Sequence, residues 1–117
     1  MCNYLRKNKF FLISIGAVPA AIFRWQIDEI FVVNAIGCFL LGIINTLPIS
    51  SRYKLIFGLG FCGSLTTFSG WSLQLFHLIS QGFYKLFFLN SILMILIGFF
   101  SVCLGRFFAN KMINLVK

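Results

Sequence analysis

Apolar residues fill four long runs of this chain, and short polar segments with turn residues or charges separate the runs. The runs cover about residues 10–27, 30–49, 55–80 and 86–108. An α-helix needs roughly 20 apolar residues to cross a hydrocarbon layer about 30 Å thick. We therefore expect an all-α integral membrane protein, with four transmembrane helices in a single domain that takes up residues 1–117.

The third run differs from the others because small and polar residues gather in its middle. Between Gly58 and Ser72 it reads GLGFCGSLTTFSGWS. Glycine is unfavourable inside a helix, and Ser and Thr side chains offer the backbone competing hydrogen bonds. At membrane depth, an irregular backbone is tolerated only where protein buries it or water reaches it. We expect the third helix to be unwound from Gly63 to Thr66, so that freed carbonyl groups can hold a cation.

The composition excludes several classes of protein. Hydrophobic residues make up 60% of the chain and charged residues 10%, whereas about a quarter of a soluble domain is charged. Asp28 and Glu29 are the only acids and fall in a turn, which argues against a proton-coupled drug exporter with an acid in the membrane. Since no nucleophile with a base, carboxylate pair or phosphate loop is present, we expect no enzyme. We interpret the four cysteines as packing residues: Cys2, Cys38, Cys62 and Cys103.

The net charge is +8, and the cationic residues lie at the ends of the apolar runs. This distribution is typical of membrane topology rather than of a nucleic-acid-binding surface. An even number of spans places both termini and the middle loop on one side of the membrane. The opposite side carries Arg24 and Lys85. The first side carries the other cationic residues: Arg6, Lys7, Lys9, Arg52, Lys54, Arg106, Lys111 and Lys117. This bias predicts that both termini lie in the cytoplasm and that the chain inserts in one orientation.

Two polar residues within or beside the first two runs have two interpretations each. Asn34 lies well inside the second run, where its amide either bonds another helix or donates to a permeating anion. Arg24 lies near the end of the first run, where it either extends to the interface or gathers anions at a pore mouth.

Three segments resemble the small fluoride-channel family called Fluc or CrcB. Residues 60–69 read GFCGSLTTFS, similar to the family's third-helix signature GFCGGxTTFSTF. Residues 33–42 read VNAIGCFLLG, similar to VNxxGSFLLG in its second helix. Residues 16–25 read GAVPAAIFRW, similar to the first-helix GGxxGAxxRY. The resemblance covers most of the chain, and its specific part is the third-helix motif.

The resemblance implies an antiparallel two-subunit bundle in a bacterial cell membrane, with two fluoride pores that lower cytoplasmic fluoride by passive export. It also implies one structural sodium ion that is not transported, held by the backbone carbonyls of Gly63 and Thr66. Hard oxygen ligands suit such a cation. The family's pore phenylalanines correspond to Phe68 and Trp71, whose ring edges would face the anion beside hydroxyls such as those of Thr67 and Ser69.

Four residues depart from the family pattern. Trp71 replaces a phenylalanine and Gly70 a threonine, while Asn90 and Met94 stand where the fourth-helix pattern YxxxSxxxG has tyrosine and serine. Together with the one-sided charge, these changes predict that the chain pairs with an oppositely oriented paralogous subunit, and the alternative partner is a second copy of this chain. The alternatives are a partly conducting or non-conducting subunit of such a pair, and a small membrane scaffold.

Overall fold

Residues 2–116 are described by a computed structural model, with side chains from residue 8 onward, and they form helices joined by short turns. The elements are α1 (Cys2–Gln26), α2 (Ile30–Thr46), α3 (Ser51–Tyr53), the π-helical η1 (Lys54–Cys62), α4 (Gly63–Leu65), α5 (Phe68–Ser80) and α6 (Tyr84–Val116). No strand occurs in this part of the chain, and the all-α prediction is confirmed.

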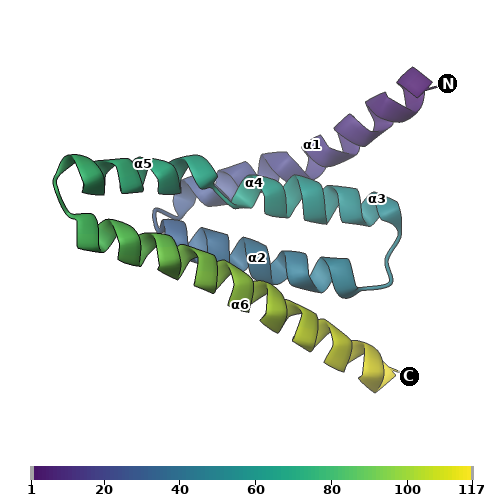
Figure 1. Ribbon diagram of the computed structural model, residues 1–117. Helices are drawn as coiled ribbons and strands as arrows, with labels where there is room; N and C mark the ends of the chain where they lie inside the picture. Colours follow the sequence, from purple (N-terminus) through teal and green to yellow (C-terminus); the bar gives the residue numbers. More distant parts are fainter. Residues whose placement is uncertain (1, 117) are drawn as a thin grey trace.

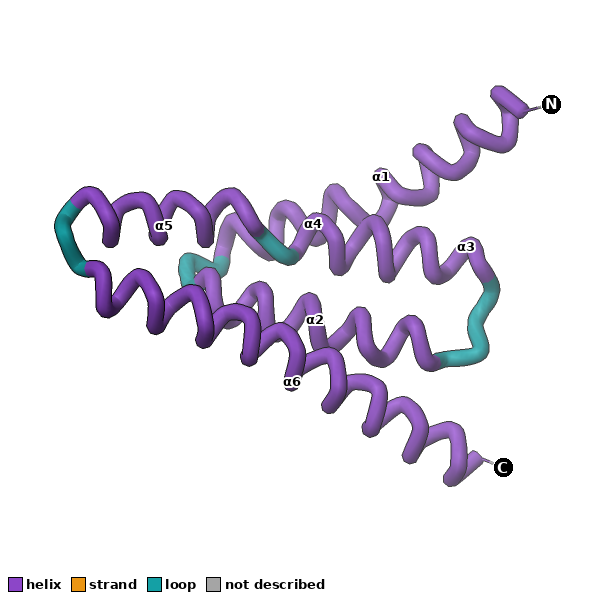
Figure 2. The backbone as a smooth tube through the Cα atoms, viewed as in Figure 1, coloured by secondary structure: helices purple, strands orange, loops and turns teal. Residues whose placement is uncertain are grey.

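The helices alternate in direction along the bundle. In Figure 1, α1 runs from the N-terminal end toward the opposite end, α2 returns, α3 to α5 run out again, and α6 returns. The two termini consequently lie at the same end of the bundle (Figure 1). The segments α3, η1 and α4 follow one another as a single rod, residues 51–65, which we call the 51–65 rod. Figure 2 shows a short non-helical step between this rod and α5.

Glycines bring the backbones of neighbouring helices into contact. A Cβ atom added at Gly42 of α2 would collide with the Val102 carbonyl of α6, and one added at Gly105 of α6 would collide with the Phe39 carbonyl of α2. A Cβ atom on Gly60 of η1 would lie 2.5 Å from the Ile13 carbonyl of α1. Small residues allow this close approach in membrane proteins. The pairs α2–α6 and α1–η1 therefore hold the 51–65 rod and α2 in place.

Replacing Gly105 by alanine is expected to lower the free energy of unfolding by about 1–3 kcal/mol, because the added methyl group overpacks the α2–α6 contact. Gly98→Ala is the matched control on the same helix. There the nearest atom to an added Cβ is Cys38 Sγ at 3.7 Å, an ordinary contact, and alanine favours the helix. Thermal unfolding in detergent measures both variants. Equal midpoints for the two would contradict the packing.

The outside of the bundle is strongly apolar. The buried hydrophobic residues are few and small for the most part: Ala20, Val33, Cys62, Leu65, Met94 and Ala109. Large side chains such as Phe68, Phe99 and Phe107 are more than half exposed. Within the described residues, α6 is the one helix that is long and apolar enough to cross a membrane, and α2 is apolar but shorter. The four-span arrangement stays a prediction.

Candidate functional site

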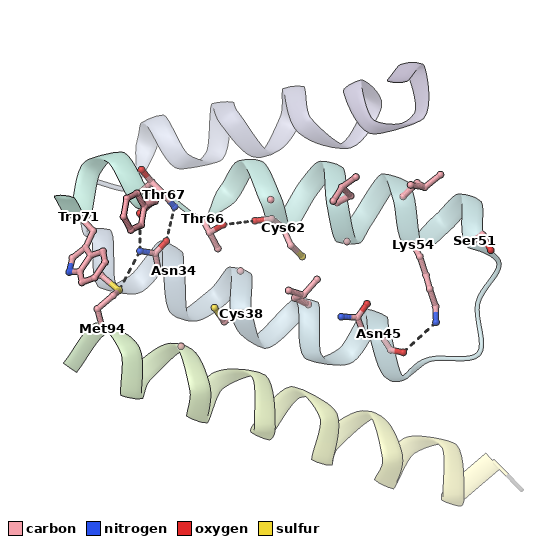
Figure 3. Close-up of a pocket in the computed structure, with 18 of the residues that line it drawn as sticks. Asn34, Cys38, Asn45, Ser51, Lys54, Cys62, Thr66, Thr67, Trp71 and Met94 are labelled. Atoms are coloured by element: carbon pink, nitrogen blue, oxygen red, sulfur yellow. Dashed lines mark hydrogen bonds between the residues drawn. The ribbon is translucent and has the colours of Figure 1, made fainter. Parts of the chain in front are cut away.

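A groove of about 950 Å³ runs along the bundle between α2, the 51–65 rod, α5 and α6. Figure 3 places Ser51 and Lys54 toward one end of this groove and Trp71 and Met94 toward the other. The groove brings together six of the residues that the sequence singled out: Asn34, Gly63, Thr66, Thr67, Phe68 and Trp71. Ser69 and Arg24, the other two, are not among its lining residues.

The helix breaks at Thr66 and Thr67, slightly later than expected. Gly63 itself is helical, with φ −65° and ψ −30°. Thr66 and Thr67 are extended, with ψ angles of 147° and 116°. The unwound residues are therefore the two threonines, and Gly63 belongs to the last turn before them.

Asn34 of α2 holds the unwound step from across the groove. Its Oδ1 accepts a hydrogen bond from the Thr67 N–H at 2.7 Å, and its Nδ2 donates to the Thr67 carbonyl at 3.2 Å (Figure 3). Nδ2 also lies 3.4 Å from Met94 Sδ of α6. Asn34 is only 9% exposed, so each of these groups needs a partner inside the protein. The Asn34 carboxamide thus replaces the hydrogen-bond partners that the N–H and the carbonyl of Thr67 would have in a continuous helix.

These side-chain bonds release two backbone carbonyls. In a continuous helix, the N–H of Thr67 would bond the Gly63 carbonyl, and the N–H of Gly70 would bond the Thr66 carbonyl. Instead, the Thr67 N–H donates to Asn34 Oδ1, and the Gly70 N–H donates to Thr67 Oγ1 at 3.1 Å. Both carbonyl groups that the sequence singled out for sodium have therefore lost their usual helical donors.

Arg24 contacts the same break from the end of α1. Its side chain is exposed, and Nη1 donates to the Ser64 carbonyl at 3.1 Å. This carbonyl would bond the Phe68 N–H in an unbroken helix. A cationic side chain at the carbonyl end of a helix is favourable, because that end carries partial negative charge. The guanidinium group therefore stabilises the end of the 51–65 rod.

Two aromatic rings lie just beyond the break, on the first turn of α5. The ring centroids of Phe68 and Trp71 are 5.5 Å apart and the ring planes meet at 71°, an edge-to-face arrangement. Phe68 is 74% exposed, whereas Trp71 is partly covered. Ser69 is exposed, and its hydroxyl lies 3.4 Å from Thr67 Oγ1.

The motifs did not indicate two of the groove's contacts. Met94 was identified only as a departure from a pattern, yet its sulfur is the second partner of the Asn34 amide. Lys54 Nζ donates to the Asn45 carbonyl at 3.3 Å. The signal for Met94 was its four-residue spacing from Asn90 and Gly98, which puts all three on one face of a helix.

Known proteins resemble this chain along most of its length. The family described as CrcB-like protein, Camphor Resistance (CrcB), matches residues 11–106. A protein of Prochlorococcus marinus (strain NATL2A) named fluoride-specific ion channel FluC 1 is 56% identical over 108 residues, covering 92% of this chain and 95% of the relative.

More distant relatives carry similar names. Fluoride-specific ion channel FluC 2 of Prochlorococcus marinus (strain MIT 9313) is 48% identical over 75 residues, covering 64% of this chain and 60% of the relative. Fluoride-specific ion channel FluC of Methanocaldococcus jannaschii is 35% identical over 117 residues, covering 87% of this chain and 94% of the relative. All three names describe ion channels, in agreement with the prediction that this chain is not an enzyme. The motif resemblance is confirmed: the chain belongs to the CrcB family of membrane proteins.

Proposed function

We propose that this chain is a subunit of a fluoride-selective channel that lowers cytoplasmic fluoride by passive export. The observation that carries the proposal is the capped break at Thr66 and Thr67, which lies in the groove beside two aromatic rings. The names of the relatives support fluoride as the ion. A helix break offers a carbonyl end to cations and an amide end to anions at one depth in the bilayer.

The carbonyl end of the break fits a structural sodium ion. The Gly63 and Thr66 carbonyls have lost their helical donors to side-chain caps, and carbonyl oxygens are ligands that hard cations accept. Gly63 is exposed, and an added Cβ would meet no atom within 4 Å beyond its chain neighbours and the backbone of its own helix. A second subunit can therefore approach this point and complete the coordination. A bound sodium ion would supply positive charge between the subunits, and the Gly63 and Thr66 carbonyls of this chain would hold it in place.

The amide end of the break fits the anion pathway. Asn34, Thr67 and Ser69 supply polar groups at the start of α5, and the rings of Phe68 and Trp71 stand beside them. The edge of an aromatic ring is electropositive, so it can face a partly dehydrated anion without a full positive charge that would trap it. Arg24 would contribute positive potential at the outer mouth while it holds the Ser64 carbonyl.

The partner we propose is an oppositely oriented paralogous chain, with the two subunits antiparallel. The strong charge bias of this sequence favours insertion with both termini in the cytoplasm, so a second copy would insert the same way. Relatives numbered FluC 1 and FluC 2 support the existence of more than one such chain in related organisms, as a paralogous partner requires. A reporter that is active only outside the cytoplasm, fused after residue 117, is expected to stay silent. Reporter activity would contradict the orientation.

The second candidate is a non-conducting membrane scaffold or accessory subunit. It is favoured by Gly70, Asn90 and Met94, which remove hydroxyl groups that the family pattern places along the pore. Growth in fluoride separates the two candidates. Deleting this gene together with that of its partner from the bacterial host is expected to make growth sensitive to fluoride, and resistance should return only when both genes are restored. Resistance that the partner gene restores alone would favour the scaffold.

A further inference from the structure

The two ends of the groove differ in charge. Among the residues that line the groove, the charged ones are Lys9 of α1 and Lys54 of the 51–65 rod. Figure 3 places Lys54 at the end that lies away from Thr67 and the break. In Figure 1 this is the end of the bundle where both chain termini lie, and the N-terminal part of α1 brings Lys9 to the same end. The groove therefore carries positive charge at the end opposite the break.

Lys54 reaches across this end of the groove from one wall to the other. It is the first residue of η1, and its Nζ donates to the Asn45 carbonyl in the last turn of α2 at 3.3 Å (Figure 3). Carbonyls in the last turn of a helix lack helical donors, so this bond fixes the position of the ammonium group. An ammonium group has three N–H donors. Two donors of Lys54 therefore remain for a ligand or for water.

The charge of Lys54 is not neutralised by an acidic side chain. Asp28 and Glu29 are the only two in the chain, and both lie in the α1–α2 turn at the opposite end of the bundle (Figure 1). Asn45 and Ser51, which line the groove beside Lys54, are exposed and uncharged. This end of the groove is thus an open mouth with a net positive charge.

The lining turns apolar between this mouth and the break. Leu41 of α2 and Leu55 and Leu59 of the 51–65 rod line the groove there. An ion that enters such a stretch loses part of its hydration, so few ions enter at a given bulk concentration. Positive charge at the mouth of a cleft with low-dielectric walls raises the local concentration of anions. The two lysines therefore stand where an anion gains most from attraction.

We propose that Lys54 collects the permeating anion at the cytoplasmic mouth of the groove, and that Lys9 adds to the positive potential there. This inference rests on the proposed function and adds to it the inner entrance, opposite the outer mouth at which Arg24 was placed. The Lys54 ammonium gives the anion its free donors, and a bond between two charged groups is stronger than its bond to the neutral Asn45 carbonyl. Because the mouth is open to water, the anion is held only weakly and can move on.

Single-channel current at low fluoride tests the charge of Lys54. Assemblies of this chain with its partner subunit are placed in planar bilayers of phosphatidylcholine, so that the lipid adds no net charge. Lys54→Gln is expected to lower the current about three- to fivefold, and Lys54→Glu about tenfold or more, as the loss or reversal of one nearby charge implies. The fall should be larger when fluoride enters at this mouth, so the ratio of the currents at opposite voltages should change.

Two further variants are controls for these currents. Lys54→Arg keeps the charge and should conduct like the wild type. Lys111→Gln removes one charge from α6 in the half of the helix that ends beside the C-terminus. Lys111 is exposed and is not among the residues that line the groove. Its variant should keep both the current and the ratio of currents at opposite voltages.

Ionic strength separates attraction by Lys54 from its bond to α2. N-methylglucamine isethionate is added at constant sodium fluoride, so that neither the permeating ion nor sodium changes. At roughly 1 M salt the Debye length is about 3 Å, and the difference between Lys54→Gln and the wild type should nearly disappear. Loss of the bond to the Asn45 carbonyl alone would lower the current at every ionic strength. Thermal unfolding in detergent shows that each variant is folded.

Three results would overturn the proposal while the channel function stands. The first is a wild-type current that Lys54→Gln and Lys54→Glu both match at low ionic strength. The second is a loss in Lys54→Gln that persists in high salt, which would assign Lys54 to the end of α2 alone. The third is an equal loss in Lys111→Gln, which would indicate a general effect of surface charge. A wild-type assembly that carries no fluoride current would contradict the proposed function itself, and this inference with it.

Discussion

Replacing Asn34 by leucine is expected to abolish fluoride conduction and to lower the free energy of unfolding by about 2–4 kcal/mol. Leucine has the same branching at Cγ but no polar group, so the N–H and the carbonyl of Thr67 would both lose their partner inside the bundle. The unwound step would then close toward a helix or shift along the groove. Fluoride efflux from liposomes and thermal unfolding in detergent measure the two effects.

Asn45→Leu is the matched control for this variant. Asn45 lies on the same helix and is exposed, and its hydrogen bond with Lys54 uses the backbone carbonyl, which leucine keeps. The control should unfold near the wild-type temperature. An Asn34→Leu protein as stable and as conductive as Asn45→Leu would contradict the role we assign to the carboxamide.

Removing sodium is expected to reduce fluoride flux by about tenfold or more and to lower the unfolding temperature. A ligand that binds only the folded assembly stabilises it by about 2.7 kcal/mol at a concentration one hundred times its dissociation constant. N-methylglucamine is too large to reach the Gly63 and Thr66 carbonyls, so it serves as the replacement cation. Efflux into sodium and N-methylglucamine solutions of equal ionic strength makes the comparison.

Readdition of sodium is the control for the sodium experiment. Flux and stability should both return as sodium is added back, at concentrations that match for the two readouts. An equal fluoride flux in the two cation solutions would contradict the structural sodium ion. It would not contradict the proposed fluoride channel.

The break in the third helix shows what local sequence can and cannot predict. Glycine, serine and threonine in an apolar run identified the interruption to within a few residues. The exact position depends on Asn34, which lies 33 residues earlier and caps Thr67. No local pattern in residues 58–72 contains that partner, so the unwound turn was predicted from Gly63 to Thr66, whereas the extended residues are Thr66 and Thr67.

Helix lengths show a second limit. The apolar runs begin near residue 10 and end near residue 108, whereas α1 begins at Cys2 and α6 continues to Val116. Hydropathy marks the part of a helix that lipid or protein covers. It does not mark the end of the helix, because residues 106–116 contain no glycine or proline to stop it. The α2–α6 contact through Gly42 was easier to anticipate, since small residues at one-turn spacing indicate close helix packing.

The arrangement of side chains at the site could be predicted only in part from the sequence. The place of Asn34 inside an apolar run identified that residue, and resemblance to the family identified Phe68 and Trp71; the structure brings all three to one groove. The contact between Arg24 and the Ser64 carbonyl joins residues 40 positions apart and depends on how α1 packs against the rod. The pairing of Asn34 with Met94 likewise depends on the α2–α6 contact, which a motif of either helix alone does not contain.

The most direct measurement is fluoride efflux from liposomes, followed with a fluoride electrode. Liposomes that contain this chain together with its oppositely oriented paralogue are expected to release fluoride rapidly and to retain chloride, while liposomes that contain either chain alone should retain both anions. Fluoride release from this chain alone would contradict the paired assembly. Retention of fluoride by every combination of correctly folded subunits would contradict the proposal that this protein is part of a channel.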